Sequence, residues 1–288
     1  MMSDLHRNRA YVVARMATPA DIGEMLRLAN QARRVYLTVR ADLLEEQLRS
    51  AFSWAVGEPD RLDGFMSAEM RAFSIAIITA AVLHDDRAVS EYADAALSVV
   101  ENDARRQGAH ALVQVGYAPW LTEALSQRGF SRRGWVVSYG WDSQPMVPGG
   151  NLAVPVSRAT EADLPTLFRL DEEVFGPIWH KQIPDFMAAL RRAFLFTVAR
   201  WGDELIGYQW CEKVEEHGHL TRLAVRPDWE GKGVGTRLLT EAMVSMVRAG
   251  ATWITLNTQE DNVRSRRLYE RHGFRLINHR VAVLWKDL

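Results

Sequence analysis

Residues 226–238 read Arg-Pro-Asp-Trp-Glu-Gly-Lys-Gly-Val-Gly-Thr-Arg-Leu, with a glycine at every second position from 231 to 235. After this stretch, apolar residues recur at helical spacing as far as Val247, and Gly250 follows as a stop signal. Glycine permits positive φ and close backbone approach, and the amides of a helix's first turn have no partner within the helix. The segment therefore predicts a glycine-rich loop that opens an amphipathic helix and can cradle a phosphate group.

This loop matches neither of two common phosphate-binding motifs. Lys232 is followed by glycine, where a Walker A loop has serine or threonine, and the acidic ribose contact of a dinucleotide-binding fold is missing. A tight turn without a ligand is the alternative interpretation of such a loop taken alone. If a phosphate binds, Lys232 and Arg237 are expected to add positive charge.

Strands are predicted on both sides of the loop and its helix. The strands expected in this half of the chain are 194–200, 204–211, 220–225 and 253–256, with two closing strands in 275–285. A second helix is expected over 263–271, stopped by Gly273. A strand, a helix and a strand in succession imply a parallel pair within an otherwise mostly antiparallel sheet.

The chain also contains an internal repeat at about half its length. The matching segments are Asp21–Leu28 with Asp163–Leu170, Arg106–Val115 with Arg248–Asn257, and Gln127–Phe130 with Arg271–Phe274. A stretch rich in proline and glycine, 142–151, separates the two halves. We therefore expect two domains, 1–147 and 148–288, both of α/β (α+β) class.

The second half resembles the GNAT superfamily of acetyl-coenzyme A-dependent N-acyltransferases. The resemblance is carried by Leu220–Pro227, Glu230–Leu239 and Asn262–Phe274, in the family's order and spacing, and covers residues 152–288. It is closest to the branch of ribosomal-protein N-terminal acetyltransferases. It implies two tandem GNAT-like domains, each a mixed, mostly antiparallel sheet flanked by helices. It also implies acetyl-coenzyme A as co-substrate, no metal, and direct attack by a primary amine in a ternary complex.

The resemblance also implies roles for the motif residues. Amides of the glycine loop would hold the pyrophosphate, and strand 223–225 would pair with the pantetheine arm. Tyr269 would protonate the departing thiolate, with core packing as the alternative, and Asn262 fits a coenzyme contact or a helix N-cap equally well. The coenzyme-binding residues implied are Leu223, Ala224, Val225, Glu230, Gly231, Lys232, Gly233, Val234, Gly235, Thr236, Arg237, Asn262 and Arg264.

Two positions depart from the family pattern. Glu230 stands where glutamine or arginine is usual, so its carboxylate would lie near phosphates. Asn257 stands where the ribosomal-protein branch tends to carry a basic glutamate, and an amide cannot accept a proton. An amine needs such an acceptor because it is mostly protonated at neutral pH. His219, Glu216 or Glu212 can act through water, and the sequence leaves the base open.

The acceptor side is predicted from fewer residues. Phe175, Trp179 and His180 are candidate wall residues, with core packing of the aromatic rings as the alternative. The expected acceptor is a small-molecule amine or a peptide N-terminus. His217 and His219 resemble a metal pair but lack further ligands, so no metal site is predicted. Backbone amides of a bulged strand near Ala224 are expected to stabilise the oxyanion.

The first half lacks the features of the predicted site. The positions that match Asn262 and Tyr269 are Ala118 and Leu125, and the counterpart of the glycine loop, 88–93, contains no glycine. We therefore expect a degenerate GNAT-like domain with a structural role or a role in shaping the acceptor pocket.

Composition restricts the partners. The chain has 35 Lys and Arg against 36 Asp and Glu, so no basic field favours nucleic acid. The single cysteine, Cys211, suits the cytoplasm, and no apolar run is long enough to span a membrane. A homodimer is possible. Three functions stay open: a tandem acetyltransferase, a non-catalytic acyl-coenzyme A sensor or interaction protein, and a tandem synthase that acylates a thiol-precursor amino sugar.

Overall fold

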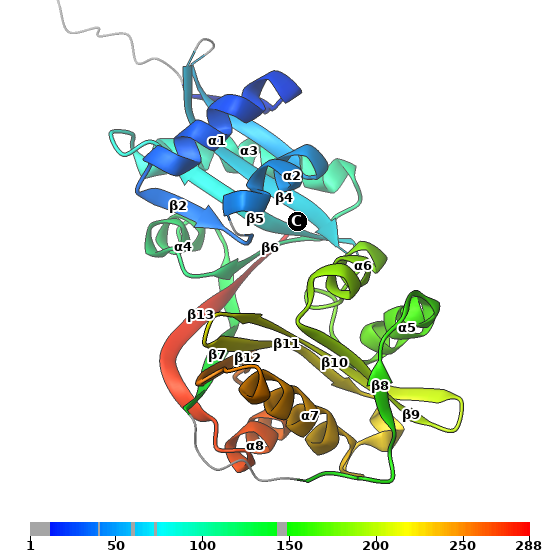
Figure 1. Ribbon diagram of the computed structural model, residues 1–288. Coiled ribbons are helices and arrows are strands. Elements are labelled where there is room, and N and C mark those ends of the chain that lie inside the picture. The colour runs from blue at the N-terminus through cyan, green and yellow to red at the C-terminus, as the bar shows by residue number, and fades with distance from the viewer. Residues whose placement is uncertain (1–11, 40, 59–60, 72–73, 143–148) are drawn as a thin grey trace, which may run out of the picture. The chain divides into compact units, whose positions relative to one another are not determined.

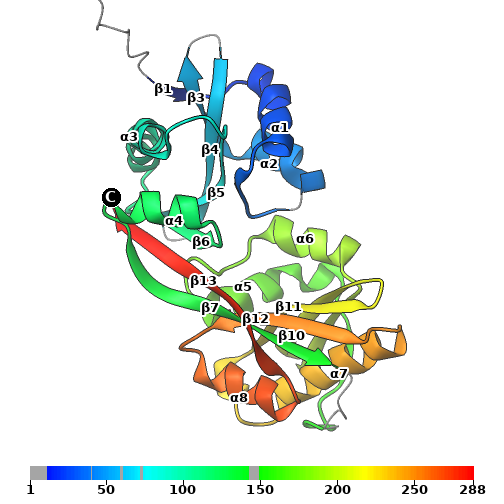
Figure 2. The same cartoon turned by 90° about the vertical axis from the view of Figure 1, so that its left-hand side faces the viewer.

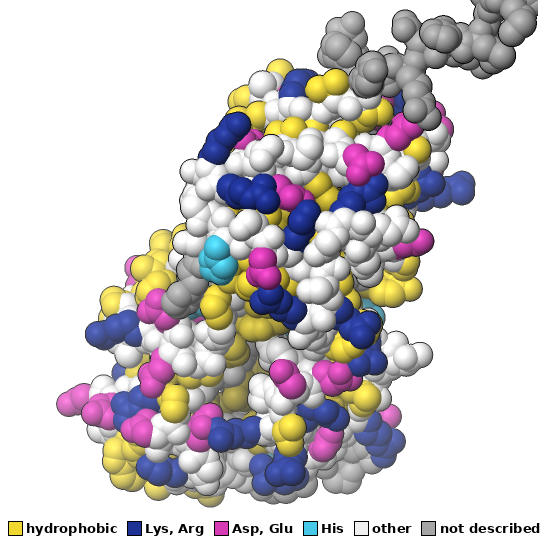
Figure 3. Space-filling model, turned by 180° about the vertical axis from the view of Figure 1, so that it is seen from behind, with side chains coloured by type: hydrophobic (Ala, Val, Ile, Leu, Met, Phe, Trp, Pro, Cys, Tyr) yellow, Lys and Arg dark blue, Asp and Glu magenta, His cyan; other side chains and the backbone are white. Residues whose placement is uncertain are grey.

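The computed structural model describes residues 12–39, 41–58, 61–71, 74–142 and 149–288. They form two compact units: unit 1 runs to Arg133 and includes Val281–Leu288, and unit 2 is Gly134–Arg280. The expected boundary between residues 147 and 148 lies outside the described residues. Among the residues described, no helix is long and apolar enough to cross a membrane. On the face in Figure 3, Lys and Arg side chains are interspersed with Asp and Glu.

Unit 1 is a sheet with helices on both faces (Figure 2). Its strands are β1 (Val13–Met16), β2 (Arg34–Leu37), β3 (Phe52–Glu58), β4 (Arg61–Arg71), β5 (Ile75–Leu83), β6 (Ala111–Gly116) and the end of β13 (Arg275–Asp287). Its helices are α1 (Ile22–Gln31), α2 (Leu44–Ser50), α3 (Val89–Arg106) and α4 (Pro119–Ser126). The strand order is β1-β3-β4-β5-β6-β13, and β2 pairs with β5 outside this order. The pair β5–β6 is parallel, and the other described pairs in this unit are antiparallel.

Unit 2 has the same layered design, with α5 and α6 on one face of its sheet and α7 and α8 on the other (Figure 1). Its strands are β7 (Ser131–Asp142, in this unit from Gly134), β8 (Val156–Arg158), β9 (Leu195–Trp201), β10 (Glu204–Val214), β11 (His217–Val225), β12 (Trp253–Gln259) and the start of β13. Its helices are α5 (Leu164–Val174), α6 (Ile183–Arg192), α7 (Val234–Arg248) and α8 (Val263–Arg271). The order is β13-β7-β12-β11-β10-β9-β8, with β11 and β12 parallel.

The predicted amphipathic helix is confirmed as α7. Its buried residues include Leu238, Leu239, Ala242, Met243 and Met246, which lie at i, i+3 and i+4 spacing. Leu239, Ala242, Met243 and Met246 pack with Cys211 of β10 in one core cluster, and Leu238 packs in a second one. Burial raises the pKa of the Cys211 thiol to about 12, so this cysteine is an unreactive core residue as expected.

The internal repeat is visible in the way each unit begins. Thr18 and Thr160 each form a capping box with an aspartate three residues later, Asp21 and Asp163. The Thr18 and Thr160 amides donate to these carboxylates at 2.7 Å and 2.8 Å. Each box opens the first helix of its unit, so the predicted fold class is confirmed in both halves.

Several predicted strand boundaries were wrong. β10 ends at Val214 and not at residue 211, and β12 ends at Gln259 and not at residue 256. β11 begins at His217 and not at residue 220, because the preceding turn is short and Glu215 adopts the positive φ of 50° that closes it. Residues 275–287 form one strand and not two, because this segment contains neither glycine nor proline to make a turn.

Candidate functional site

The two parallel strands of unit 2, β11 and β12, pair along only part of their length. We call the place where their pairing stops the fork. β11 and β12 pair over His217–Leu220 and Trp253–Leu256, and the described pairing stops there. The opposite edge of β11 stays paired with β10 as far as Val225. Residues 221–225 therefore present an unpaired backbone edge to the gap between β11 and β12.

A β-bulge lies at the point where the fork begins. Trp210 pairs with Arg222 and Cys211 pairs with Leu220, so Thr221 is the extra residue on β11. A bulge turns the strand and redirects its backbone groups. The bulge expected near Ala224 thus lies three residues earlier, at Thr221.

The glycine loop has the backbone geometry of an anion cradle. Gly231 and Gly233 have φ of 73° and 79°, and Gly233 is the N-cap of α7. A Cβ at Gly233 would lie 3.0 Å from the Asn151 amide nitrogen. The Arg237 amide donates to Gly233 O at 3.0 Å, so the three earlier amides of α7 have no partner within the helix. These features fit a diphosphate.

A pocket of about 1160 Å³ connects the fork to this loop. The predicted coenzyme residues that line it are Leu223, Ala224, Val225, Glu230, Gly231, Gly233, Gly235, Thr236, Asn262 and Arg264. Phe175 and Trp179 of the predicted acceptor wall line it too. Lining residues that were not predicted include Gln259, Ser265, Leu268 and Arg271. Helical spacing from Asn262 was a usable signal for the last three, which lie on α8.

Three predicted coenzyme residues do not line this pocket. The Lys232 ammonium lies 4.7 Å from the centroid of the Trp229 ring. Arg237 pairs with Glu241 at 2.9 Å along α7. Val234 is buried in the core with Leu238. Their side chains are engaged by the protein itself, so the backbone of the loop provides the cradle.

The departure at Glu230 is compensated within the pocket. Glu230 forms an ion pair with Arg264 at the start of α8. The carboxylate near the loop is therefore partly neutralised by a neighbouring cation. Asn262, two residues earlier, accepts a hydrogen bond from the Ser265 amide at 3.1 Å, so its N-cap interpretation is confirmed.

Tyr269 lies in the core beside the pocket. It is 6% exposed, and its ring contacts Tyr139 and Phe274 at centroid distances of 6.2 Å and 6.1 Å. Its neighbours Ser265 and Leu268 line the pocket, whereas Tyr269 does not. Burial raises the pKa of the Tyr269 hydroxyl to about 12, so this group keeps its proton at neutral pH and is available only as a donor.

The histidine pair shares one partner. His217 Nε2 and His219 Nδ1 each lie 2.8 Å from Thr255 Oγ1. Burial lowers the pKa of His219 to about 4, which makes it a weak base. Glu216 lies at the turn before β11, where its carboxylate is 3.4 Å from Thr252 Oγ1. The predicted base candidates His219, Glu216 and Glu212 do not line the pocket.

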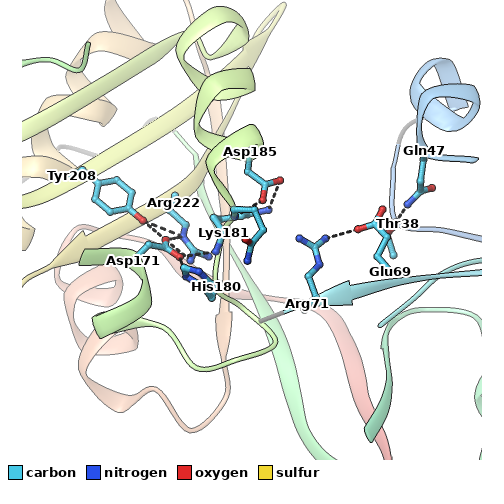
Figure 4. A network of polar contacts seen from close by, with 11 residues as sticks. Thr38, Gln47, Glu69, Arg71, Asp171, His180, Lys181, Asp185, Tyr208 and Arg222 are labelled. Atoms are coloured by element: carbon cyan, nitrogen blue, oxygen red, sulfur yellow. Dashed lines mark hydrogen bonds and ion pairs between the residues drawn. The ribbon is translucent and has the colours of Figure 1, made fainter. Parts of the chain in front are cut away.

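The segment that carries the predicted acceptor wall is anchored on a buried carboxylate, Asp171 near the end of α5 (Figure 4). Asp171 Oδ2 accepts from Arg222 Nε at 2.8 Å and Nη2 at 2.5 Å, and from the Tyr208 hydroxyl. Asp171 Oδ1 accepts from the Lys181 amide at 2.7 Å and contacts His180 Nδ1 at 3.1 Å. Three elements therefore converge on one carboxylate.

The contacts of Asp171 fix the positions of the predicted wall residues. His180 is only 2% exposed and packs under the wall, whereas Phe175 and Trp179 face the pocket. The Phe175 ring covers the Arg222 guanidinium at 3.4 Å. Sequence analysis did not identify Asp171 or Arg222, because a lone charge on a helix and one on a strand carry no pairing signal.

Among the described residues, no three His, Cys, Asp or Glu side chains are grouped as metal ligands. The forked sheet, the bulge and the glycine loop at the start of α7 together define a GNAT-type fold. Residues 164–274 match the acetyltransferase (GNAT) family.

A mycothiol acetyltransferase of Geodermatophilus obscurus is 34% identical over 98 residues, which are 32% of this chain and 31% of that relative. Two solved structures resemble nearly the whole chain. A GCN5-related N-acetyltransferase from Sphaerobacter thermophilus has a TM-score of 0.65 at 16% identity, over 96% of both chains. A tandem GNAT protein from the clavulanic acid biosynthesis pathway has 0.63 at 15%, over 95% of this chain and 97% of that one. The match to the GNAT family thus lies within unit 2, and the chain as a whole has the fold of a tandem GNAT protein.

Proposed function

We propose that the protein is an acetyl-coenzyme A-dependent N-acetyltransferase that acts on a primary amine through a ternary complex. One observation carries the proposal: a single pocket in unit 2 joins an amide cradle at the start of α7 to the unpaired edge of β11. This arrangement suits a long ligand with a diphosphate at one end and an extended amide chain at the other.

The proposed acetyl transfer uses groups that lie in the pocket or next to it. Amides on the open edge of β11 suit the oxyanion that forms when the amine attacks a thioester. Tyr269 is the proposed proton donor to the departing thiolate, because it keeps its proton at neutral pH and follows Leu268, which lines the pocket. The wall formed by Phe175 and Trp179 suits the acceptor side.

The acceptor is proposed as a small-molecule amine or a peptide N-terminus. A second candidate is a thiol-precursor amino sugar, which the 34% identity to a mycothiol acetyltransferase favours. The third alternative is a non-catalytic acyl-coenzyme A sensor. Such a protein would have the same pocket but would release no thiol.

The test is thiol release from acetyl-coenzyme A over a panel of alkyl amines, short peptides and amino sugars. The wild type should bind one coenzyme per chain by calorimetry and release thiol with at least one acceptor class. Gly233→Ala should weaken binding at least ~30-fold, because it places a Cβ against Asn151 in a left-handed conformation. Gly250→Ala is the matched control, since Gly250 also has positive φ but its Cβ meets nothing within 4 Å.

The outcomes separate the candidates. Coenzyme binding without thiol release for every acceptor supports the sensor. No coenzyme binding by the wild type contradicts both the enzyme and the sensor.

A further inference from the structure

Three polar side chains on neighbouring strands of unit 2 form a hydrogen-bonded trio. Ser138 of β7 donates its hydroxyl hydrogen to Asn257 Oδ1 of β12 at 2.7 Å. Ser138 Oγ also lies 2.9 Å from His279 Nδ1 of β13. Because serine has one hydrogen to give, the hydrogen in the second bond comes from His279 Nδ1. The neutral imidazole therefore keeps Nε2 as its free, basic nitrogen.

Asn257, the inner member of the trio, lies two residues from a residue that lines the pocket. Asn257 is the first residue of β12 after its pairing with β11 ends at Leu256. Gln259 lies two residues further on, points to the same side of the strand, and lines the pocket. Asn257 is therefore about 7 Å from a lining residue along the strand. From Asn257 the trio leads outward through Ser138 to the exposed His279.

We propose that His279 is the proton acceptor of the acetyl transfer, and that Ser138 and Asn257 are positioning residues that fix its tautomer. This inference rests on the proposed function. As the amine nitrogen bonds to the acetyl carbon, its proton passes through water to His279 Nε2. The bond from that carbon to sulfur breaks, and the thiolate takes a proton from Tyr269. Both side chains then exchange protons with solvent.

The other candidate bases are less suited. His219 binds a proton only weakly, because its pKa is lowered to about 4, and its Nδ1 already contacts Thr255. Glu216 lies at the turn before β11, at the paired end of the two strands. His279 makes its contact within the trio through Nδ1, so the trio leaves its Nε2 free to accept a proton.

Charged and titratable groups lie on β13 itself, on β11 and β10 of the same sheet, and at Glu260 after β12. Arg280, on the other side of β13, pairs with Glu260 at 2.8 Å and stacks on Trp135. On the side of the trio, His217 and His219 of β11 both contact Thr255. Glu212 of β10 is paired opposite His219 and is exposed. The charge of Arg280 is thus balanced by Glu260, and none of these groups occupies Nε2 in the structure.

The test compares pH profiles of thiol release at saturating acetyl-coenzyme A. His279→Gln should lower kcat/KM for the amine about 100-fold at pH 7 and remove the acidic limb of the profile, with coenzyme affinity unchanged. Ser138→Ala should displace that limb and lower kcat/KM several-fold. Asn257→Glu, added to His279→Gln, should restore at least ~10-fold by placing a carboxylate at the fork. His217→Gln is the matched control on the same face and should leave the profile unchanged.

A failure of the proposed function can be distinguished from a failure of this inference alone. A wild type that releases no thiol with any amine at any pH overturns the proposed function and this inference together. An active wild type whose profile is the same in His279→Gln overturns this inference alone. If His279→Gln does not fold, an unchanged acidic limb in Ser138→Ala also overturns it.

Discussion

The two units contain the same fork, and only one of them is open. In unit 1, β5 and β6 pair over Ile75–Ile78 and Ala111–Gln114, which are the counterparts of the paired residues in unit 2 at an offset of 142. The bulge repeats as well: Thr79 is the extra residue in unit 1, as Thr221 is in unit 2. The framework of the site is therefore present twice.

In unit 1 the fork is filled by the chain itself. β4 covers one edge of β5 along its whole length, so β2, which pairs with Ala80–Leu83, must lie on the edge that faces β6. The Tyr36 hydroxyl of β2 lies 3.2 Å from Ile78 O and 2.9 Å from Val115 O, and so bridges the two strands. Gly116 makes room, since a Cβ there would meet the Tyr36 ring at 2.5 Å. A short strand occupies the place of an extended ligand.

The difference follows from the segment after the first helix of each unit. In unit 2 this segment is held by Asp171, through the Lys181 amide and His180. The counterparts of Asp171, Tyr208 and Arg222 in unit 1 are Ala29, Phe65 and Ala80, which pack in an apolar cluster. Without a carboxylate to hold it, the equivalent segment pairs with β5 as β2. We infer from this comparison that the buried carboxylate of Asp171 keeps the fork of unit 2 open.

Loss of Asp171 should have the largest effect. Asp171→Asn leaves the buried Arg222 guanidinium without a counter-charge, and we expect the free energy of unfolding to fall by about 3–5 kcal/mol. Chemical denaturation measures this loss, and coenzyme affinity should fall with it. Asp228→Asn is the control, because Asp228 is 61% exposed beside Arg226 and its loss should leave the free energy of unfolding nearly unchanged. Equal losses in both variants would contradict the role given to Asp171.

Tyr269→Phe should separate chemistry from binding. Removing the hydroxyl takes away the proton donor but keeps the ring between Tyr139 and Phe274. We expect kcat to fall about 100-fold while the Kd of acetyl-coenzyme A stays within ~2-fold. Tyr117→Phe, an exposed tyrosine of unit 1, should change neither quantity. A Tyr269→Phe variant with normal kcat would leave Tyr269 with a packing role alone.

Tyr36→Phe tests whether the fork of unit 1 is closed by its own strand. The change leaves two carbonyls of β5 and β6 without the hydroxyl, so stability should fall by about 1–2 kcal/mol. Calorimetry should still count one coenzyme per chain, because β2 stays paired. A second coenzyme site in the wild type or in this variant would mean that β2 does not block the fork.

Local patterns predicted much of this molecule and missed what depends on distant contacts. The glycines at 231, 233 and 235 and the spacing of apolar residues in α7 act within one turn of chain, so they were readable. Ala118 and Leu125, which match Asn262 and Tyr269, predict in the same way that unit 1 lacks the site, and this stays a prediction.

The strand β2 was not predicted, because four residues become a strand only through the edge that β5 offers them. Asp171 and Arg222 meet from positions 51 residues apart, and Ser138 meets His279 across 141 residues. Contacts of this kind depend on the completed fold, so a single sequence contains no local signal for them.

The smallest effect is expected at the mouth of the open fork. Glu230→Gln removes the carboxylate from its pair with Arg264 and frees that cation for the coenzyme phosphates. Because Arg264 is 67% exposed, the gain is screened, and we expect acetyl-coenzyme A to bind about three-fold tighter at low salt and about equally at 0.5 M salt. Glu241→Gln, which breaks the pair with Arg237 on α7, should leave the Kd unchanged. Weaker binding by Glu230→Gln would show that the carboxylate helps to hold the coenzyme, as an acceptor for one of its donors, and is no obstacle to it.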